Sequence, residues 1–387
     1  MVDVISLNSE QQKAVTAKSG PVLVLAGPGS GKTRVLTQRF AYLVSEGINP
    51  NIILAVTFTN RAAEEMRERI HVQVDSERKV RNVGTFHAIC VRLLRNESDA
   101  AVVADDFVIF DSTDQRSLIK QSMTYHNVDD TRYKLHTIHS TISTAKNDLV
   151  NFSNFVRDSY YHEIVGRVYE RYQYLLDQNN ALDFDDLLMR AVLLLKNNPV
   201  ISRKYQDIYQ RILVDEFQDT NLAQYSLLRL LSGDNRDLFV VGDPDQSIYR
   251  WRGADYRNVD RFKSDYSEAV VIQLRQNYRS TQIILDAATA VISKNHVGDS
   301  ISLFSDFQGG DKIIVHEAYD EEENLDNRIE MVIDEVKKLT ELSLDELLEK
   351  IQKIKNICIY NRELLVKIYH ENPRYKNLKK CLQKTVI

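Results

Sequence analysis

The chain has 387 residues, enough for two or three domains that each bury a hydrophobic core. Hydrophobic residues make up 43% and charged residues 27%, which is ordinary for a globular protein and excludes a disordered or membrane-embedded class. The formal net charge of −5 excludes an overall basic field, so any nucleic-acid contact must come from a local surface.

Cysteine usage and the lack of apolar segments predict a cytoplasmic protein. Cys90, Cys358 and Cys381 show no metal-ligand spacing and suit a reducing compartment. The first residues lack the basic and apolar regions of a signal peptide. No apolar run approaches the roughly 18 residues of a membrane span.

Short β-branched runs, each followed by a polar turn and a helical pattern, recur along the chain. Such runs predict strands at residues 21–25, 52–57, 80–85, 211–214, 238–241 and 270–274. Strands that alternate with helices predict an α/β fold, a mainly parallel sheet with helices on both faces and ligands at the carboxyl ends of the strands.

Two parts of the chain depart from this rhythm. Residues 111–180 are polar, rich in Tyr and His, and predict a helical insertion. Beyond residue 280 the pattern predicts a helix at 281–293, a strand at 312–315, an acidic helix at 321–339 and a strand at 357–360. We therefore expect one discontinuous domain of residues 1–110 and 181–279, the insertion, and part of a second α/β domain in residues 280–387.

A glycine-rich loop joins the first predicted strand to a helical pattern. Its residues are Ala26-Gly27-Pro28-Gly29-Ser30-Gly31-Lys32-Thr33. Backbone N–H groups of such a loop, with the helix N-terminus behind them, cradle a polyphosphate. Lys32 would reach the β- and γ-phosphates of ATP, and the Thr33 hydroxyl would ligate Mg²⁺. Ala26 stands where the strict pattern has glycine, but a small residue still allows the turn.

Paired carboxylates follow the predicted strand at 211–214. Asp215 would hold Mg²⁺, directly or through water, and Glu216 would orient and deprotonate an attacking water. An isolated Asp-Glu pair after a strand is more often a solvated loop, but here it accompanies the phosphate loop.

The strand at 238–241 leads into a polar loop that carries Gln246 and an aromatic-basic cluster. Gln246 could contact the γ-phosphate and report its loss. Tyr249, Trp251 and Arg252 interleave aromatic and basic side chains, which suits stacking on bases with phosphate contacts. The alternative is a core tryptophan covered by an arginine.

Other aromatic residues follow strands or begin helices. Phe58 and Asn60 end one strand, Phe86 and His87 end another, and Phe184 precedes a helix. Each phenylalanine taken alone fits a core residue better, whereas their shared placement favours a nucleic-acid groove. His87 is interpreted as a hydrogen-bonding residue.

Arg279 falls where the first α/β domain gives way to the second. An arginine there could reach the γ-phosphate as an arginine finger. A solvated surface arginine is the alternative.

Taken together, these segments resemble the superfamily 1 DNA helicases of the UvrD, Rep and PcrA type. The resemblance covers about the first 280 residues and extends more weakly beyond them. Its distinctive segments are Thr57-Phe58-Thr59-Asn60, Val214-Asp215-Glu216-Phe217-Gln218-Asp219-Thr220 and Gln246-Ser247-Ile248-Tyr249-Arg250-Trp251-Arg252-Gly253.

The resemblance implies a RecA-like ATP-binding fold and further residue roles. Gln11 would read the adenine edge, while Arg34 and Tyr278 would flank the adenine ring. Arg279 would be the arginine finger, and Gln246 would couple hydrolysis to DNA. The residues that would stack on bases of single-stranded DNA are Phe58, Phe184, Tyr249 and Trp251.

The family moves 3′ to 5′ along single-stranded DNA and unwinds duplex junctions in repair or replication. Its second RecA-like domain is longer than the residues left here, so we expect a truncated or split product, or a second polypeptide that supplies the remainder. The alternatives are a nucleotide-gated single-stranded-DNA-binding ATPase that does not unwind, and an unrelated phosphate-loop enzyme such as a small-molecule kinase.

Overall fold

The computed structural model describes residues 7–74, 80–235, 237–247, 253–255, 257–293, 301–310 and 313. All of these except residue 313 belong to one compact unit, residues 1–311. The elements predicted at 312–315, 321–339 and 357–360 therefore lie outside the described residues, apart from Ile313.

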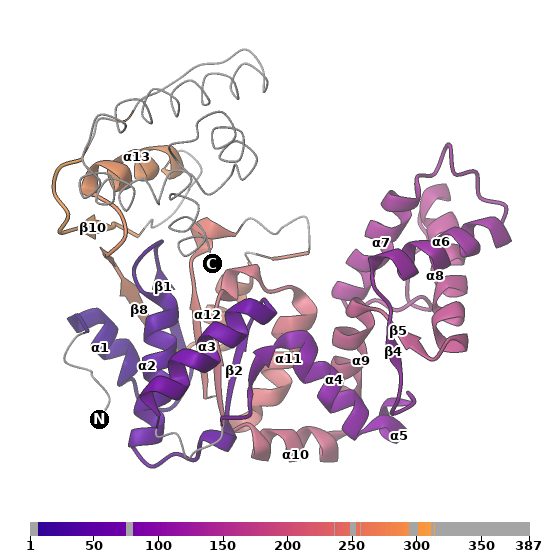
Figure 1. The fold of residues 1–387 in the computed structure, drawn as a ribbon. Coiled ribbons are helices and arrows are strands. Elements are labelled where there is room, and N and C mark those ends of the chain that lie inside the picture. Colours follow the sequence, from indigo (N-terminus) through magenta and orange to yellow (C-terminus); the bar gives the residue numbers. More distant parts are fainter. Residues whose placement is uncertain are drawn as a thin grey trace, which may run out of the picture. The chain divides into compact units, whose positions relative to one another are not determined.

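A six-stranded parallel sheet forms the centre of this unit (Figure 1). Its strands, in spatial order, are β3 (Val83–Thr85), β2 (Ile53–Thr57), β6 (Arg211–Val214), β7 (Leu238–Gly242), β1 (Val22–Ala26) and β8 (Val270–Leu274). The predicted α/β fold is confirmed. The predicted strand at 80–85 is too long: β3 covers only Val83–Thr85, and its Cα pairing with β2 begins at Ala55 and Val83.

Successive residues of a strand point to opposite sides of the sheet, and every residue of β1, β2 and β7 is buried, so both faces of these strands are covered. The edge strand β8 is more exposed. Leu23, Leu54 and Val240 pack into one hydrophobic cluster. Their neighbours Val24 and Val241 pack into the other. This alternation explains why the strands read as continuous apolar runs in the sequence.

Helices cover the two faces. The first cluster includes residues of α4 (Phe86–Asn96), α9 (Phe184–Asn197), α10 (Pro199–Ile208), α11 (Leu222–Ser232) and α12 (Asn258–Asp265). The second includes residues of α1 (Ser9–Val15), α2 (Lys32–Ser45) and α3 (Asn60–Gln73). Short turns of helix are α5 (Ser98–Ala101), η1 (Pro50–Ile52), η2 (Phe217–Asp219), η3 (Gly233–Asn235) and η4 (Pro244–Gln246). Among the described residues, no helix has both the length and the apolar character needed to cross a bilayer.

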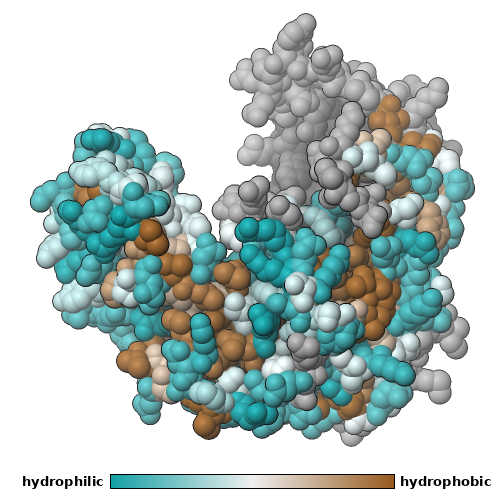
Figure 2. Space-filling view, turned by 180° about the vertical axis from the view of Figure 1, so that it is seen from behind, coloured by the Kyte–Doolittle hydropathy of each residue, from teal (hydrophilic) through white to brown (hydrophobic). Residues whose placement is uncertain are grey.

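Three helices lie in the chain between the two short strands β4 (Val108–Ile109) and β5 (Ala181–Leu182), which pair in parallel. They are α6 (Ser112–Tyr125), α7 (Leu135–Asn147) and α8 (Tyr160–Gln178). Ile119, Ile138, Val168 and Tyr172 belong to a hydrophobic cluster of their own. The surface over this segment is mainly hydrophilic on the face drawn in Figure 2, because its apolar side chains face that cluster.

Beyond β8 the chain begins a small separate sheet. β9 (Gln276–Asn277) pairs in parallel with β10 (Phe304–Ser305), and α13 (Gln282–Ile292) lies between them in the chain. The predicted helix at 281–293 thus corresponds to α13.

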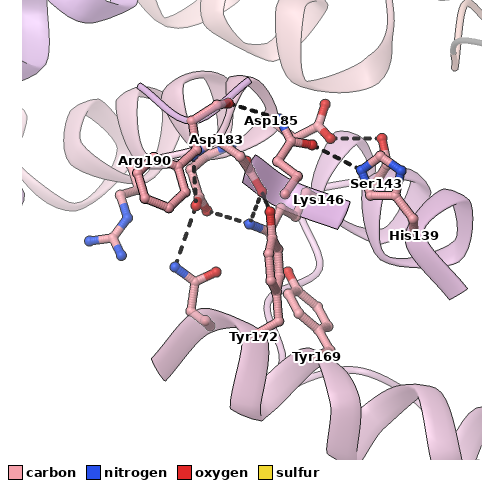
Figure 3. A network of polar contacts seen from close by, with 12 residues as sticks. His139, Ser143, Lys146, Tyr169, Tyr172, Asp183, Asp185 and Arg190 are labelled. Atoms are coloured by element: carbon pink, nitrogen blue, oxygen red, sulfur yellow. Dashed lines mark hydrogen bonds and ion pairs between the residues drawn. The ribbon is translucent and has the colours of Figure 1, made fainter. Parts of the chain in front are cut away.

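A buried ion network ties α7 to the start of α9 (Figure 3). The Lys146 ammonium lies 2.7 Å from Asp183 Oδ2 and 2.9 Å from Asp186 Oδ1, and its side chain is fully buried. Tyr172 donates a hydrogen bond of 2.8 Å to Asp183. Burial alone would lower the pKa of Lys146, but the two carboxylates raise it, so the lysine stays charged.

We expect Lys146→Met to lower the free energy of unfolding by about 3–5 kcal/mol, because it leaves buried carboxylates without a cation. Urea unfolding followed by circular dichroism measures the effect. Lys120→Met, at an exposed position of α6, is the matched control and should change stability by less than about 0.5 kcal/mol. Equal unfolding midpoints for Lys146→Met and the unaltered protein would contradict this reading of the network.

Candidate nucleotide-binding site

The glycine-rich loop connects β1 to α2 at the carboxyl end of the sheet. Gly29 and Gly31 have φ values of +67° and +88°, which side-chain-bearing residues rarely adopt. Ala26 is the last residue of β1 and is not among the described residues with positive φ, which explains why alanine serves in place of glycine. Gly31 is the N-cap of α2, and no side chain caps this helix. The first N–H groups of α2 therefore suit an anion.

Lys32 lies among acceptors from two neighbouring strand ends. Its Nζ is 3.4 Å from the Ala26 carbonyl oxygen, 3.4 Å from Gln246 Oε1 and 3.6 Å from Asp243 Oδ2. These distances are long for hydrogen bonds, so the ammonium is loosely held. The structure thus brings Lys32 and Gln246 together, although 214 positions separate them in the sequence.

Thr33 and Asp215 form the second pair that the sequence predicted to act together. Thr33 Oγ1 donates a hydrogen bond of 3.0 Å to Asp215 Oδ2. Burial, with a smaller contribution from Glu216, raises the pKa of Asp215 to about 6. The Thr33 hydroxyl and the Asp215 carboxylate thus place two hard oxygen atoms side by side, and a cation between them would offset the cost of ionising the buried carboxylate. The pair therefore fits a Mg²⁺ site completed by phosphates and water.

Glu216 sits in a strained backbone conformation. Its φ is +51°, in the left-handed region that a residue with a side chain adopts at a cost. The Glu216 N–H donates to Asp215 Oδ1 at 3.0 Å, and the Glu216 carboxylate accepts a hydrogen bond of 2.8 Å from Gln218 Nε2.

Two residues of this site were missed by the sequence predictions. Asp243, at the end of β7, is 1% exposed, and burial raises its pKa to about 6 although Lys32 opposes the shift. Gln218 is also 1% exposed and accepts a hydrogen bond from the Asp243 N–H. The available signals were the position of Asp243 shortly after a predicted strand and that of Gln218 within the segment Val214–Thr220, but neither showed that the two residues meet.

Two of the three residues expected around adenine are hydrogen-bonded to the phosphate loop. Gln11 is buried, and its Nε2 donates a hydrogen bond of 2.9 Å to the Ser30 carbonyl. The Tyr278 N–H donates to the Gly29 carbonyl at 2.9 Å, and the Tyr278 ring is 42% exposed. Arg34 follows in the first turn of α2 and is exposed.

Arg279 is anchored beside the loop by a residue that the sequence predictions missed. Asn277 Nδ2 donates to the Pro28 carbonyl at 2.5 Å, while Asn277 Oδ1 accepts from the Arg279 N–H at 2.8 Å. A Cβ added to Gly29 would lie only 2.7 Å from the Cβ of Arg279. The backbone of the predicted arginine finger therefore packs directly on the phosphate loop.

The predicted nucleic-acid residues differ in exposure. Asn60 is exposed, Phe58 is half-buried, and Phe184 is 45% exposed. The ring of Phe184 meets that of His87 edge to face, with centroids 5.6 Å apart, and burial lowers the pKa of His87. Phe86, in contrast, is buried in the core. Tyr249, Trp251 and Arg252 lie outside the described residues.

Two cavities of about 590 and 310 Å³ lie elsewhere, along α5, β5 and α9. None of the predicted site residues lines either cavity. The nucleotide site is thus marked by its loop and its carboxylates, and neither of these two cavities is part of it.

We expect Asp215→Asn to stabilise the metal-free protein at pH 7.5. The folded state holds the Asp215 proton up to about pH 6, whereas the unfolded chain releases it near 3.8, so this carboxyl group destabilises the fold increasingly from about pH 4 and fully above pH 6. A difference of about two pH units is worth at most about 3 kcal/mol. The gain should fade as the pH drops from 6 towards 4.

Thermal unfolding in EDTA at several pH values measures this effect. Asp130→Asn, at an exposed position, is the control and should leave the midpoint unchanged at pH 7.5. A lower midpoint for Asp215→Asn at pH 7.5 would contradict the assignment of a costly buried charge.

The sequence matches two family models in succession. Residues 7–267 match the UvrD/REP helicase N-terminal domain, and residues 272–370 match the UvrD-like helicase C-terminal domain. The ATP-dependent DNA helicase PcrA of Staphylococcus epidermidis is 45% identical over 336 residues, which cover 86% of this chain and 46% of the relative. PcrA of Staphylococcus aureus is 44% identical over 335 residues, 86% of this chain and 45% of the relative.

The chain thus spans about half the length of the curated relatives it matches. The N-terminal family model covers more than half of the chain, and the matched segments include every element of the nucleotide site described above. The chain belongs to the UvrD/REP helicase family.

Proposed function

We propose that this chain is the ATP-hydrolysing part of a DNA motor that moves 3′ to 5′ along single-stranded DNA and unwinds duplex junctions. One observation carries the proposal. The carboxyl ends of β1, β6 and β7 bring together Lys32, Thr33, Asp215, Glu216 and Gln246, and the segment that carries Arg279 packs on the same loop. Family membership supports DNA as the polymer on which the motor acts.

Adenine would bind beside the phosphate loop. Gln11 would read the adenine edge, and Arg34 and Tyr278 would flank its ring. The anchoring of Gln11 on Ser30 and of Tyr278 on Gly29 supports these roles, because both residues are tied to the loop that would hold the phosphates.

Hydrolysis would take place between the strand ends and Arg279. Lys32 and Arg279 would stabilise charge on the γ-phosphate, and Glu216 would orient the attacking water and accept its proton. Thr33 and Asp215 would hold Mg²⁺, which when bound neutralises charge on the β- and γ-phosphates. Gln246, next to Lys32, would respond to the loss of the γ-phosphate.

Single-stranded DNA would cross the carboxyl ends of β2 and β3. Phe58 and Phe184 offer aromatic faces there, and Asn60 and His87 offer polar groups. Tyr249, Trp251 and Arg252 stay predictions from the sequence, as do the cytoplasmic location, a role in DNA repair or replication, and a second polypeptide that supplies further helicase residues.

ATP hydrolysis with and without single-stranded DNA, and strand displacement on 3′-tailed and 5′-tailed duplexes, test the proposal. We expect DNA to stimulate hydrolysis strongly and only the 3′-tailed duplex to be unwound. Lys32→Ala should lower turnover at least about a hundredfold, because it removes a fixed positive charge from the reacting phosphate. Lys18→Ala, at an exposed position away from the loop, is the control.

Other results of these assays would favour one of the alternative functions or contradict the assignment of the phosphate loop. DNA binding with hydrolysis but without strand displacement would favour the nucleotide-gated binding module. Hydrolysis or phosphate transfer without any oligonucleotide binding at low salt would favour an unrelated phosphate-loop enzyme. Unchanged turnover in Lys32→Ala would contradict the loop assignment.

Phe184→Ala should weaken binding of a single-stranded oligonucleotide by about 1–3 kcal/mol, the contribution of one stacked base. Fluorescence anisotropy at fixed salt measures the dissociation constant, which should also rise as the salt concentration increases. Tyr160→Ala removes a ring that is 70% exposed on the helical segment and should leave the dissociation constant unchanged. Equal affinities for Phe184→Ala and the unaltered chain would remove Phe184 from the groove.

A further inference from the structure

Gln218 links the two strand ends that carry the chemistry of the site. Its side-chain amide donates a hydrogen bond of 2.8 Å to Glu216 Oε2 and accepts one of 2.9 Å from the Asp243 N–H. We propose that Gln218 is a positioning residue that aims the Glu216 carboxylate at the attacking water. The inference rests on the ATP hydrolysis proposed above.

Only a side-chain amide of this length satisfies both contacts. A carboxamide carries a donor and an acceptor on one rigid group, whereas an ionised carboxylate has no donor and an aliphatic side chain has neither. Asparagine is one methylene shorter and could not keep both contacts from the same backbone position. The hydrogen bond occupies one oxygen of Glu216 and leaves the other to accept a proton.

The backbone conformation of Glu216 also depends on the residues around it. A residue held at a φ of +51° keeps that conformation only when its surroundings enforce it. Gln218 is buried in the 3₁₀ turn η2 and makes its weaker third contact, 3.4 Å long, with Asp219 Oδ2. The turn and the amide together fix the direction of the Glu216 side chain at the start of η2.

Gly242 supplies an independent observation. A Cβ added to Gly242 would lie 2.9 Å from Gln218 Oε1 and 3.2 Å from the Gln218 backbone nitrogen. Gly242 is not among the described glycines with positive φ, so its conformation alone does not require glycine. The missing side chain instead leaves the space that the Gln218 amide occupies.

The same amide holds the turn that carries Gln246. The amide accepts from the Asp243 N–H, and Asp243 as the N-cap of η4 accepts from the Asp245 N–H at 3.1 Å. The main-chain carbonyl of Gln218 also accepts a hydrogen bond of 3.3 Å from Ser247 Oγ. Gln218 therefore connects the proposed base to the turn that bears the proposed γ-phosphate sensor.

Gln218→Met tests the inference, since methionine keeps the volume and length of the side chain but cannot replace either hydrogen bond. We expect kcat for DNA-stimulated ATP hydrolysis to fall about 10- to 100-fold, with KM for ATP changed less than about threefold. The dissociation constant of a fluorescent, non-hydrolysable ATP analogue should not change. Gln224→Met removes another buried glutamine, in the capping box of α11, and should keep the unaltered kcat.

A double-mutant cycle decides whether Gln218 acts through Glu216. In the Glu216→Gln background, Gln218→Met should lower the residual kcat by less than about twofold, because the carboxylate it positions is gone. Gly242→Ala should lower kcat in the same way as Gln218→Met, and it serves as the second variant if Gln218→Met does not fold.

Three results would overturn the inference. One is an unaltered kcat in Gln218→Met or Gly242→Ala, and another is an equal loss in both backgrounds of the cycle. The third is a loss in KM or analogue binding rather than in kcat. If the unaltered chain does not hydrolyse ATP, the proposed function itself fails. If the chain is active but its kcat does not change in Gln218→Met, only the inference on Gln218 fails.

Discussion

The candidate site depends on the order of the strands in the central sheet. The chain passes from β1 to β2 across a gap that β6 and β7 later fill, so β7 pairs directly with β1 and β6 pairs with β7. Because all these pairs are parallel, their carboxyl ends meet at one edge. Lys32 therefore contacts Gln246, and its neighbour Thr33 contacts Asp215, although these residues come from three distant parts of the chain.

This arrangement buries negative charge, which lowers the stability of the free protein. Asp215, Asp219 and Asp243 all have their pKa raised to about 6, with burial as the largest cause. On the function proposed above, Mg²⁺ held by Thr33 and Asp215 would place a cation beside this cluster, so metal binding and relief of this cost would be coupled. The carboxylates that destabilise the free protein are those expected to select its ligand.

The helical segment is tied to the same region through polar contacts. Asn221 follows the carboxylate-bearing loop, and its Nδ2 donates to Asn147 Oδ1 at 2.5 Å. Asn147 in turn donates to Asp185 Oδ1 at 2.9 Å, beside the buried pair of Lys146 and Asp183. Buried polar contacts of this kind are satisfied in few arrangements, so they favour one placement of α7 against α9 and α11.

The amino-acid sequence by itself determined the strands, the phosphate loop and the carboxylate pair, because each depends on local chemistry: short continuous apolar runs, glycine at positive φ, and carboxylates after a strand. Only the tertiary structure decided that Gln218 meets Asp243, that Asn277 anchors Arg279 to Pro28, and that Phe86 is buried while Phe184 is 45% exposed. These outcomes depend on strand order and register, which arise from contacts between segments up to 249 positions apart. No local pattern encodes such contacts, because the same short segment could pack in several ways until the whole core forms.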